Sequence, residues 1–279
     1  MVRPELDAPG IRLSVGELLA LRDGALRPGR HRPASRRPGA LPAKPAGAGM
    51  DLREIRAFTE GDDTRRIDPA ATARTGMPHI RSFHEDRDDT VLLIADFRPP
   101  MLWGTGRALR SVRAARALAR HGWRALARGA SVAVIGVSAA GVTLVRSGAG
   151  VQHMGRIALM LATGHDRALD AAGESPSLSE ALIRAARLAP PGGEVLLATS
   201  AEGVASEDEP PLARLARRRR VRLLLPLDPI DTAPPTLALP IQHGPLSRLA
   251  RLQPLDTLAL ARRLRALNVS LEVIADDAG

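Results

Sequence analysis

The sequence predicts an α/β fold: a doubly wound, mostly parallel β-sheet with helices on both faces. Short apolar runs, of the kind that form strands buried on both faces, recur from residue 90 onward. Amphipathic helical patterns separate these runs. Regular alternation of strand and helix favours a parallel sheet covered on both sides, and ligands bind such sheets at the carboxyl ends of the strands.

The first ninety residues precede this alternation. Ser14 and Glu17 have the spacing of a capping box, which predicts a short helix that begins there. Residues 27–49 are dense in Pro, Gly, Ala and Arg, as is typical of a linker. We therefore expect a helix and Arg/Pro-rich N-terminal arm over 1–46, a charged segment that packs on the main domain over 47–89, and the α/β domain over 90–279.

Within the α/β domain, each element has its own signal in the sequence. Apolar runs predict strands over 91–95, 132–137, 142–145, 194–198, 221–227 and 270–275, the third being an antiparallel return of the second. Amphipathic patterns predict helices over 107–128, 153–162, 178–189, 211–219 and 255–267. A second capping box, from Ser177 to Glu180, opens the third helix. The proline-rich segment over 228–253 is expected to be irregular.

Composition narrows the classes of function. The net charge is +10, but Lys44 is the only lysine, and the arginine excess together with abundant Ala, Gly and Pro indicates coding bias. Aromatic residues make up 2% of the chain and tyrosine is absent, so stacking platforms for single-stranded nucleic acid are not expected. Nucleic-acid binding through the arginine-rich arm is a minor alternative.

Several further classes are disfavoured. The chain has no cysteine, which excludes disulfides and cysteine metal sites. No apolar stretch approaches the roughly 18 residues of a membrane-spanning helix, and the first residues lack an apolar signal region. We expect a cytoplasmic protein without a membrane span.

The most specific signal lies between residues 47 and 97. A charged run is followed by a second polar motif over 73–76, an acidic stretch over 85–88, and the strand that ends in Asp96. The signature positions of the run and the second motif are Gly61, Asp62, Asp63, Arg65, Arg66, Asp68 and Arg74. Their order and spacing resemble the bacterial family catalogued as domain of unknown function 58. The resemblance implies a von Willebrand factor A-like fold and an association with MoxR-type AAA+ ATPases, in chaperone-like assembly or activation of other complexes.

The charged segment departs from the family at one position. Pro69 stands where the family usually has Trp, and proline's fixed φ predicts an altered local path. No nucleophile or base lies at motif spacing in the segment. We therefore expect its Asp and Arg side chains to form bidentate pairs that clamp it onto the sheet domain.

The larger departure follows the first predicted strand. The resemblance implies an Asp-x-Ser-x-Ser motif there, a metal-ion-dependent adhesion site, but Arg98 and Pro100 stand at the two hydroxyl positions after Asp96. Arginine cannot coordinate a metal, and proline has no side-chain oxygen. Ser177 and Thr199 lie near the other two ligand loops. We predict a degenerate site with no metal and no other cofactor, in which Asp96 forms an ion pair with Arg98 or another arginine.

These inferences favour a non-enzymatic protein-interaction or adaptor module. Arginines recur every three or four residues along the predicted helix over 107–128, as a solvated face or as a docking surface for an acidic partner. The candidate partner surface comprises Arg98, Met101, Trp103, Arg107, Arg110, Arg116 and Arg120. The alternative is a nucleotide-dependent hydrolase, but Gly104 to Gly106 lack a complete phosphate-binding pattern.

Overall fold

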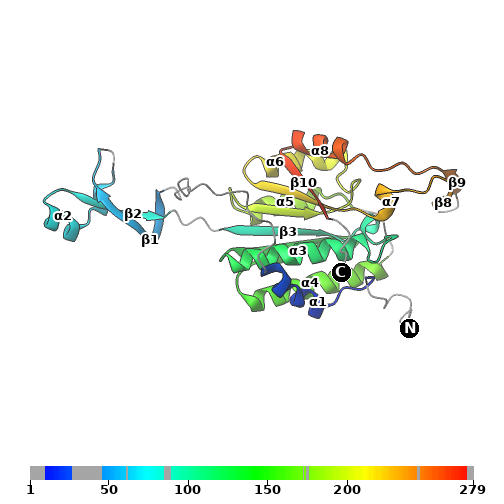
Figure 1. Ribbon diagram of the computed structural model, residues 1–279, viewed down its shortest axis with the longest axis horizontal. Coiled ribbons are helices and arrows are strands. Elements are labelled where there is room, and N and C mark those ends of the chain that lie inside the picture. The colour runs from blue at the N-terminus through cyan, green and yellow to red at the C-terminus, as the bar shows by residue number, and fades with distance from the viewer. Residues whose placement is uncertain are drawn as a thin grey trace. The chain divides into compact units, whose positions relative to one another are not determined.

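The computed structural model describes residues 10–26, 46–60, 62–84, 89–171, 173, 176–243 and 246–274 (Figure 1). The chain forms two compact units, one of residues Met1–Arg27 with Asp89–Gly279 and the other of residues Pro28–Asp88. The Arg/Pro-rich arm over 27–45, Gly61 and the acidic stretch over 85–88 lie outside the described residues. Each unit is described by itself.

A six-stranded sheet forms the centre of the larger unit. Its strands are β3 (Thr90–Asp96), β4 (Ser131–Ser138), β5 (Gly141–Gly148), β6 (Glu194–Ala198), β7 (Arg220–Pro226) and β10 (Val269–Ile274). They lie in the order β10-β7-β6-β3-β4-β5, and all neighbours are parallel except β4 and β5. Counted along the chain, this is the doubly wound order 3-2-1-4-5-6. The predicted fold class is confirmed, including the antiparallel return.

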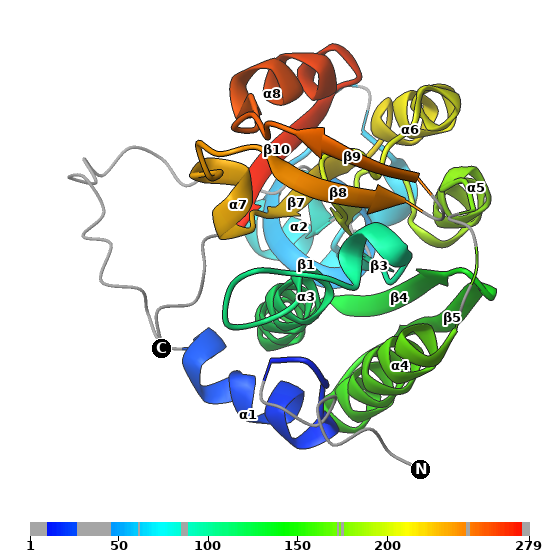
Figure 2. The ribbon, with the colours of Figure 1, turned by 90° about the vertical axis from the view of Figure 1, so that its right-hand side faces the viewer.

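Helices cover both faces of this sheet (Figure 2). One face carries α1 (Val15–Leu26), α3 (Arg110–Ala127) and α4 (Val151–Asp170), and the other α5 (Ser179–Leu188), α6 (Glu209–Ala216) and α8 (Thr257–Ala266). Alternate residues of β3 enter different cores: Leu93 packs in the α3 core and Leu92 in the α5 core. Because both side chains are fully buried, β3 needed the uninterrupted apolar run that predicted it.

The segment expected to be irregular is partly regular. It contains the short helix α7 (Pro229–Thr232) and an antiparallel hairpin of β8 (Leu239–His243) and β9 (Leu246–Ala250). The prediction of irregular structure is wrong for this part because proline does not break an edge strand. Pro240 lies within β8, which is tolerated because both strands of a two-stranded sheet are edge strands.

The smaller unit is built on an antiparallel pair, β1 (Ala46–Ala57) and β2 (His79–His84), with η2 (Thr64–Arg66) and α2 (Pro69–Thr75) between them. The Asp68 carboxylate caps α2 by accepting a hydrogen bond of 2.7 Å from the Ala71 N–H. Pro69 is the first residue of α2, where a missing N–H costs nothing. The proline that departs from the family therefore begins a helix.

Two Asp–Arg pairs hold this smaller unit together. Asp62 accepts hydrogen bonds of 2.7 and 2.9 Å from the Arg56 guanidinium, and Asp68 accepts one of 2.7 Å from Arg81 Nε. The Arg56 guanidinium and bonds from Thr59 hold the pKa of Asp62 well below its usual range. Because all these partners lie in the same unit, these two pairs stabilise the segment itself, and its packing on the sheet domain stays a prediction. Asp63 caps η2, and Arg65 and Arg74 are exposed.

Candidate functional site

The candidate site lies at the point of the large sheet where the strand order reverses, between β3 and β6. Strands β3 and β6 are neighbours at the centre of the sheet, and chain connections leave them on opposite sides. Doubly wound sheets bind ligands in the crevice at such a point, beyond the carboxyl ends of the strands. Asp96 is the last residue of β3, and Thr199 follows β6 directly.

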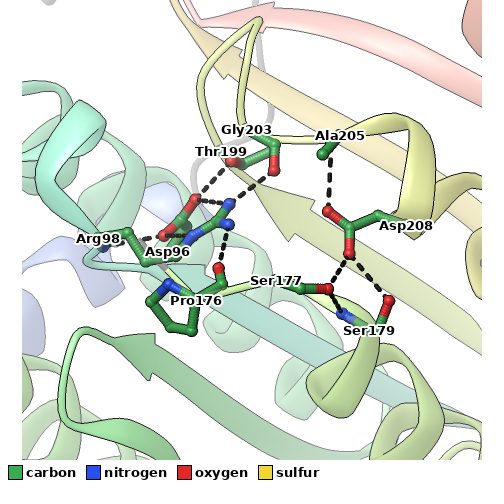
Figure 3. Close-up of polar contacts among 9 residues, drawn as sticks. All are labelled: Asp96, Arg98, Pro176, Ser177, Ser179, Thr199, Gly203, Ala205 and Asp208. Carbon is green, nitrogen blue, oxygen red and sulfur yellow. Dashed lines mark hydrogen bonds and ion pairs between the residues drawn. The ribbon is translucent and has the colours of Figure 1, made fainter. Parts of the chain in front are cut away.

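A buried ion pair fills this position (Figure 3). Arg98 Nε donates to Asp96 Oδ1 at 2.9 Å, and Arg98 Nη2 donates to Oδ2 at 2.7 Å. The same carboxylate accepts bonds from the Arg98 N–H at 2.9 Å and from Thr199 Oγ1 at 2.6 Å. The Arg98 side chain is 6% exposed and that of Asp96 is 1% exposed. The predicted partner of Asp96 is therefore confirmed.

The Arg98 guanidinium also joins three separate segments of chain. Its Nη1 donates to the Pro176 carbonyl oxygen at 2.7 Å, and its Nη2 donates to the Gly203 carbonyl oxygen at 2.6 Å (Figure 3). One cation thus contacts four oxygens from the end of β3, the loop before α5 and the loop after β6. Because arginine stays protonated, the positive charge at this point is permanent.

A second buried carboxylate lies beside this pair. Asp208 accepts hydrogen bonds from Ser177 Oγ at 2.6 Å, Ser179 Oγ at 3.0 Å and the Ala205 N–H at 3.1 Å (Figure 3). The predicted capping box is only half formed: Ser177 Oγ accepts a hydrogen bond of 3.0 Å from the Ser179 N–H at the start of α5, whereas Glu180 pairs with Arg184. Sequence reasoning missed Asp208, although an acidic residue just before Glu209 and two prolines is a signal for a helix start.

A third polar cluster lies at the end of β7. Arg110 Nη2 donates to both oxygens of Asp231, at 2.5 and 2.6 Å, and the guanidinium stacks on Trp103 at 4.0 Å. Nearby, Asp228 accepts bonds from the Thr105 N–H at 2.7 Å and from the Thr105 hydroxyl. Burial raises the pKa of Asp228, but these hydrogen bonds outweigh that effect and leave the pKa below its usual value.

The predicted partner surface needs correction. Arg98, Met101 and Arg110 are buried, Met101 in the apolar core and the two arginines in their ion pairs, so none of them forms an external surface. Trp103, which is 39% exposed, and Arg107 do face outward.

The arginine face predicted for α3 is solvated only in part: Arg124 and Arg128 are exposed, but other members are not. Arg113 is buried and donates to the Leu227 and Ile274 carbonyl oxygens. Arg116 pairs with Glu17 of α1, and Arg120 is only partly exposed. Helix α1 covers the side of α3 that carries Arg116, and Arg113 faces the ends of β7 and β10; sequence periodicity does not show which element covers which side of a helix.

Two kinds of element are absent from the described part of the chain. No group of three or more His, Cys, Asp or Glu side chains there is placed to hold a metal ion. No helix there has the length and apolar character of a membrane span.

The strand order, with Asp96 and Thr199 at the point where it reverses, defines a von Willebrand factor A-like α/β protein. Residues 54–233 match the family described as "Protein of unknown function DUF58", and the chain belongs to this family.

Known proteins resemble the chain more distantly. An uncharacterized protein of Mycobacterium bovis is 28% identical over 189 residues, or 68% of this chain, and the chain spans only 58% of that relative. An aerotolerance-related membrane protein from Bacteroides fragilis is 13% identical over 67% of this chain and 92% of its own, with a TM-score of 0.45. A von Willebrand factor type A structure from Catenulispora acidiphila is 13% identical over 70% of this chain and 40% of its own, with a TM-score of 0.39.

Proposed function

We propose that the chain is a non-enzymatic protein-interaction or adaptor module. It acts in the cytoplasm with a MoxR-type AAA+ ATPase, in the assembly or activation of another protein complex. Its adhesion site works without a metal ion. The observation that carries the proposal is the position of the Arg98 guanidinium. This cation, which is part of the chain itself, contacts four oxygens at the point between β3 and β6 where the strand order reverses.

The residues at this site do not fit a divalent metal. Mg²⁺ requires close to six oxygen ligands in octahedral geometry. Both Asp96 carboxylate oxygens already accept hydrogen bonds from Arg98, and position 100 is a proline. The positive charge of the Arg98 guanidinium, two residues after Asp96 in the chain, would also repel a divalent cation at this site. These features support recognition by protein contacts rather than by a bridging metal.

The neighbouring loop supports a non-catalytic role as well. A nucleotide-dependent hydrolase would need backbone N–H groups free to bind phosphate oxygens. In the glycine-containing loop before α3, the Thr105 N–H and hydroxyl both donate to Asp228. A carboxylate anion therefore occupies donors that a phosphate would require, and its charge would repel one.

Titration of the chain with the purified, nucleotide-free ATPase tests the proposal. The expected result is saturable binding whose affinity is the same with Mg²⁺ and with EDTA, because no metal bridges the partners. Binding that disappears in EDTA would contradict the metal-independent site, and absence of binding in both buffers would contradict the partnership. A parallel thermal-shift screen with nucleotides tests the hydrolase alternative, since specific binding would raise the melting temperature.

A further inference from the structure

The β8–β9 hairpin is a separate element at the carboxyl edge of the large sheet. Its two strands pair with each other and with no strand of that sheet. Figures 1 and 2 show it beside α7, at the end of the larger unit where β7 finishes. An isolated two-stranded hairpin is at best marginally stable in water. Such an element gains stability when another surface covers it.

The hairpin and its flanks expose apolar side chains. Leu237, just before β8, is 76% exposed, Leu249 in β9 is 75% exposed, and Leu258 in the first turn of α8 is 75% exposed. Among the described residues, no other large hydrophobic side chain is as exposed as these three. Leu237 and Leu249 lie within two residues of the Leu239–Ala250 pair, at the same end of the hairpin. Exposed apolar residues gathered in one place mark interaction sites, whereas scattered ones need no explanation.

The charged side chains of the segment that contains the hairpin are all positive. Residues 232–255 contain two arginines, Arg248 and Arg251, and no acidic residue. Both arginines are exposed. Charged groups at an interface are arranged so that the potentials of the partners complement each other. The complement of an apolar hairpin with a basic rim is an apolar groove with an acidic rim.

A rigid aromatic side chain lies at the base of the hairpin. Trp103 stacks on Arg110, whose guanidinium is fixed by Asp231. The carbonyl oxygen of Asp231 accepts a hydrogen bond of 2.8 Å from the Leu255 N–H, which ties the chain returning from the hairpin to the same point. A partly exposed tryptophan held in one orientation loses little entropy on binding, which is a property of interface hot spots.

We infer that the β8–β9 hairpin, with Leu237, Leu249 and Trp103, is a docking element that inserts into an apolar, acidic-rimmed groove of a partner protein. The inference rests on the proposed function, because it names the surface that the adaptor presents. The arginines at positions 248 and 251 face the acidic rim, while the two leucines and the tryptophan are buried in the groove.

The test compares two double variants in binding to the purified ATPase. In Leu237→Asp/Leu249→Asp the docking leucines become acidic. In the control, Leu159→Asp/Ile183→Asp, two exposed residues on α4 and α5 change in the same way. The hairpin variant is expected to bind about 100-fold more weakly, from the lost burial of two leucines, and the control to bind as the native chain does. Unfolding curves that match the native chain show that both variants fold.

A second readout uses the two tryptophans of the chain. Labelled with 5-fluorotryptophan, the chain gives one ¹⁹F signal from Trp103 and one from the buried Trp123. Addition of unlabelled ATPase is expected to shift the Trp103 signal and leave that of Trp123 in place.

Three outcomes would overturn the inference. If the hairpin variant binds the ATPase with the affinity of the native chain and the Trp103 signal does not shift, the hairpin is not the docking element. The proposed function would then be unaffected. Absence of ATPase binding by the native chain would remove both. A dimer of the native chain that dissociates in the hairpin variant would replace the partner by a second copy.

Discussion

Replacement of Arg98 by alanine is expected to destabilise the larger unit strongly. The substitution removes the guanidinium that neutralises Asp96 and joins the loops before α5 and after β6. Asp96 keeps its hydrogen bonds from the Thr199 hydroxyl and from the backbone N–H of residue 98, but its charge stays buried without a counter-ion. The carbonyl oxygens of Pro176 and Gly203 lose their guanidinium donor as well.

The magnitude follows from this burial. Breaking a buried ion pair by removal of one partner costs about 3–5 kcal/mol, because the remaining charge is desolvated. The two hydrogen bonds that Asp96 retains put the expected loss near the lower limit, about 3 kcal/mol. The matched control is Arg184→Ala, which breaks an exposed i,i+4 pair with Glu180 and is expected to cost about 0.5 kcal/mol.

Urea unfolding followed by tryptophan fluorescence, to which Trp123 in the α3 core contributes, measures both losses. A double-mutant cycle that adds Asp96→Asn separates the pair from its surroundings, since the two losses should be strongly non-additive. A free energy of unfolding for Arg98→Ala within about 1 kcal/mol of the native value would refute the reasoning.

Three further results are expected. Gly203→Ala should lower the melting temperature, because the added Cβ would overlap the Thr199 hydroxyl, whereas Gly155→Ala, with open space around it on α4, should be neutral or stabilising by up to about 1 kcal/mol. Burial lowers the pKa of His165 to about 4, below its ordinary 6.5, so the unfolded chain takes up that proton first as the pH falls. Stability should therefore drop by about 2 kcal/mol between pH 7 and pH 5, and His165→Gln should flatten the urea-measured profile; an unchanged slope would count against a buried neutral imidazole. Asp62→Asn should speed amide exchange in β1 and β2 and leave the large sheet unaffected, because its arginine partner belongs to the same unit; equal exchange in β1 and β2 would argue against the pair.

Local patterns predicted much of the fold. The apolar run of β3 and the amphipathic faces of α5 and α8 each carry their own signal, because burial on one or both faces dictates residue type directly. Arg98 was likewise one of the partners predicted for Asp96, because it lies two residues away at a position where the family motif has a hydroxyl. These features depend on residues close together in the chain.

The features that the sequence did not predict depend on distant partners. Arg113 is buried because its acceptors, the carbonyl oxygens of Leu227 and Ile274, lie more than a hundred positions further along the chain. Helix α1 covers a face of α3 that the spacing of the arginines along that helix predicted to be exposed to solvent. The Ser177 hydroxyl accepts a local hydrogen bond from the Ser179 N–H and also donates to the distant carboxylate of Asp208, which the sequence did not predict. Each of these features depends on tertiary packing that local patterns do not contain.

Titration of Mg²⁺ into the native chain tests most directly whether Arg98 stands in place of a metal. The comparison is an Arg98→Ser/Pro100→Ser variant, which provides the two hydroxyls that the native sequence lacks after Asp96. If the Arg98 guanidinium occupies the place of the metal, calorimetric titration of the native chain with Mg²⁺ should give no saturable heat, and its melting temperature should not change. The variant should bind Mg²⁺ measurably. Saturable Mg²⁺ binding by the native chain, with a rise in its melting temperature, would contradict that arrangement.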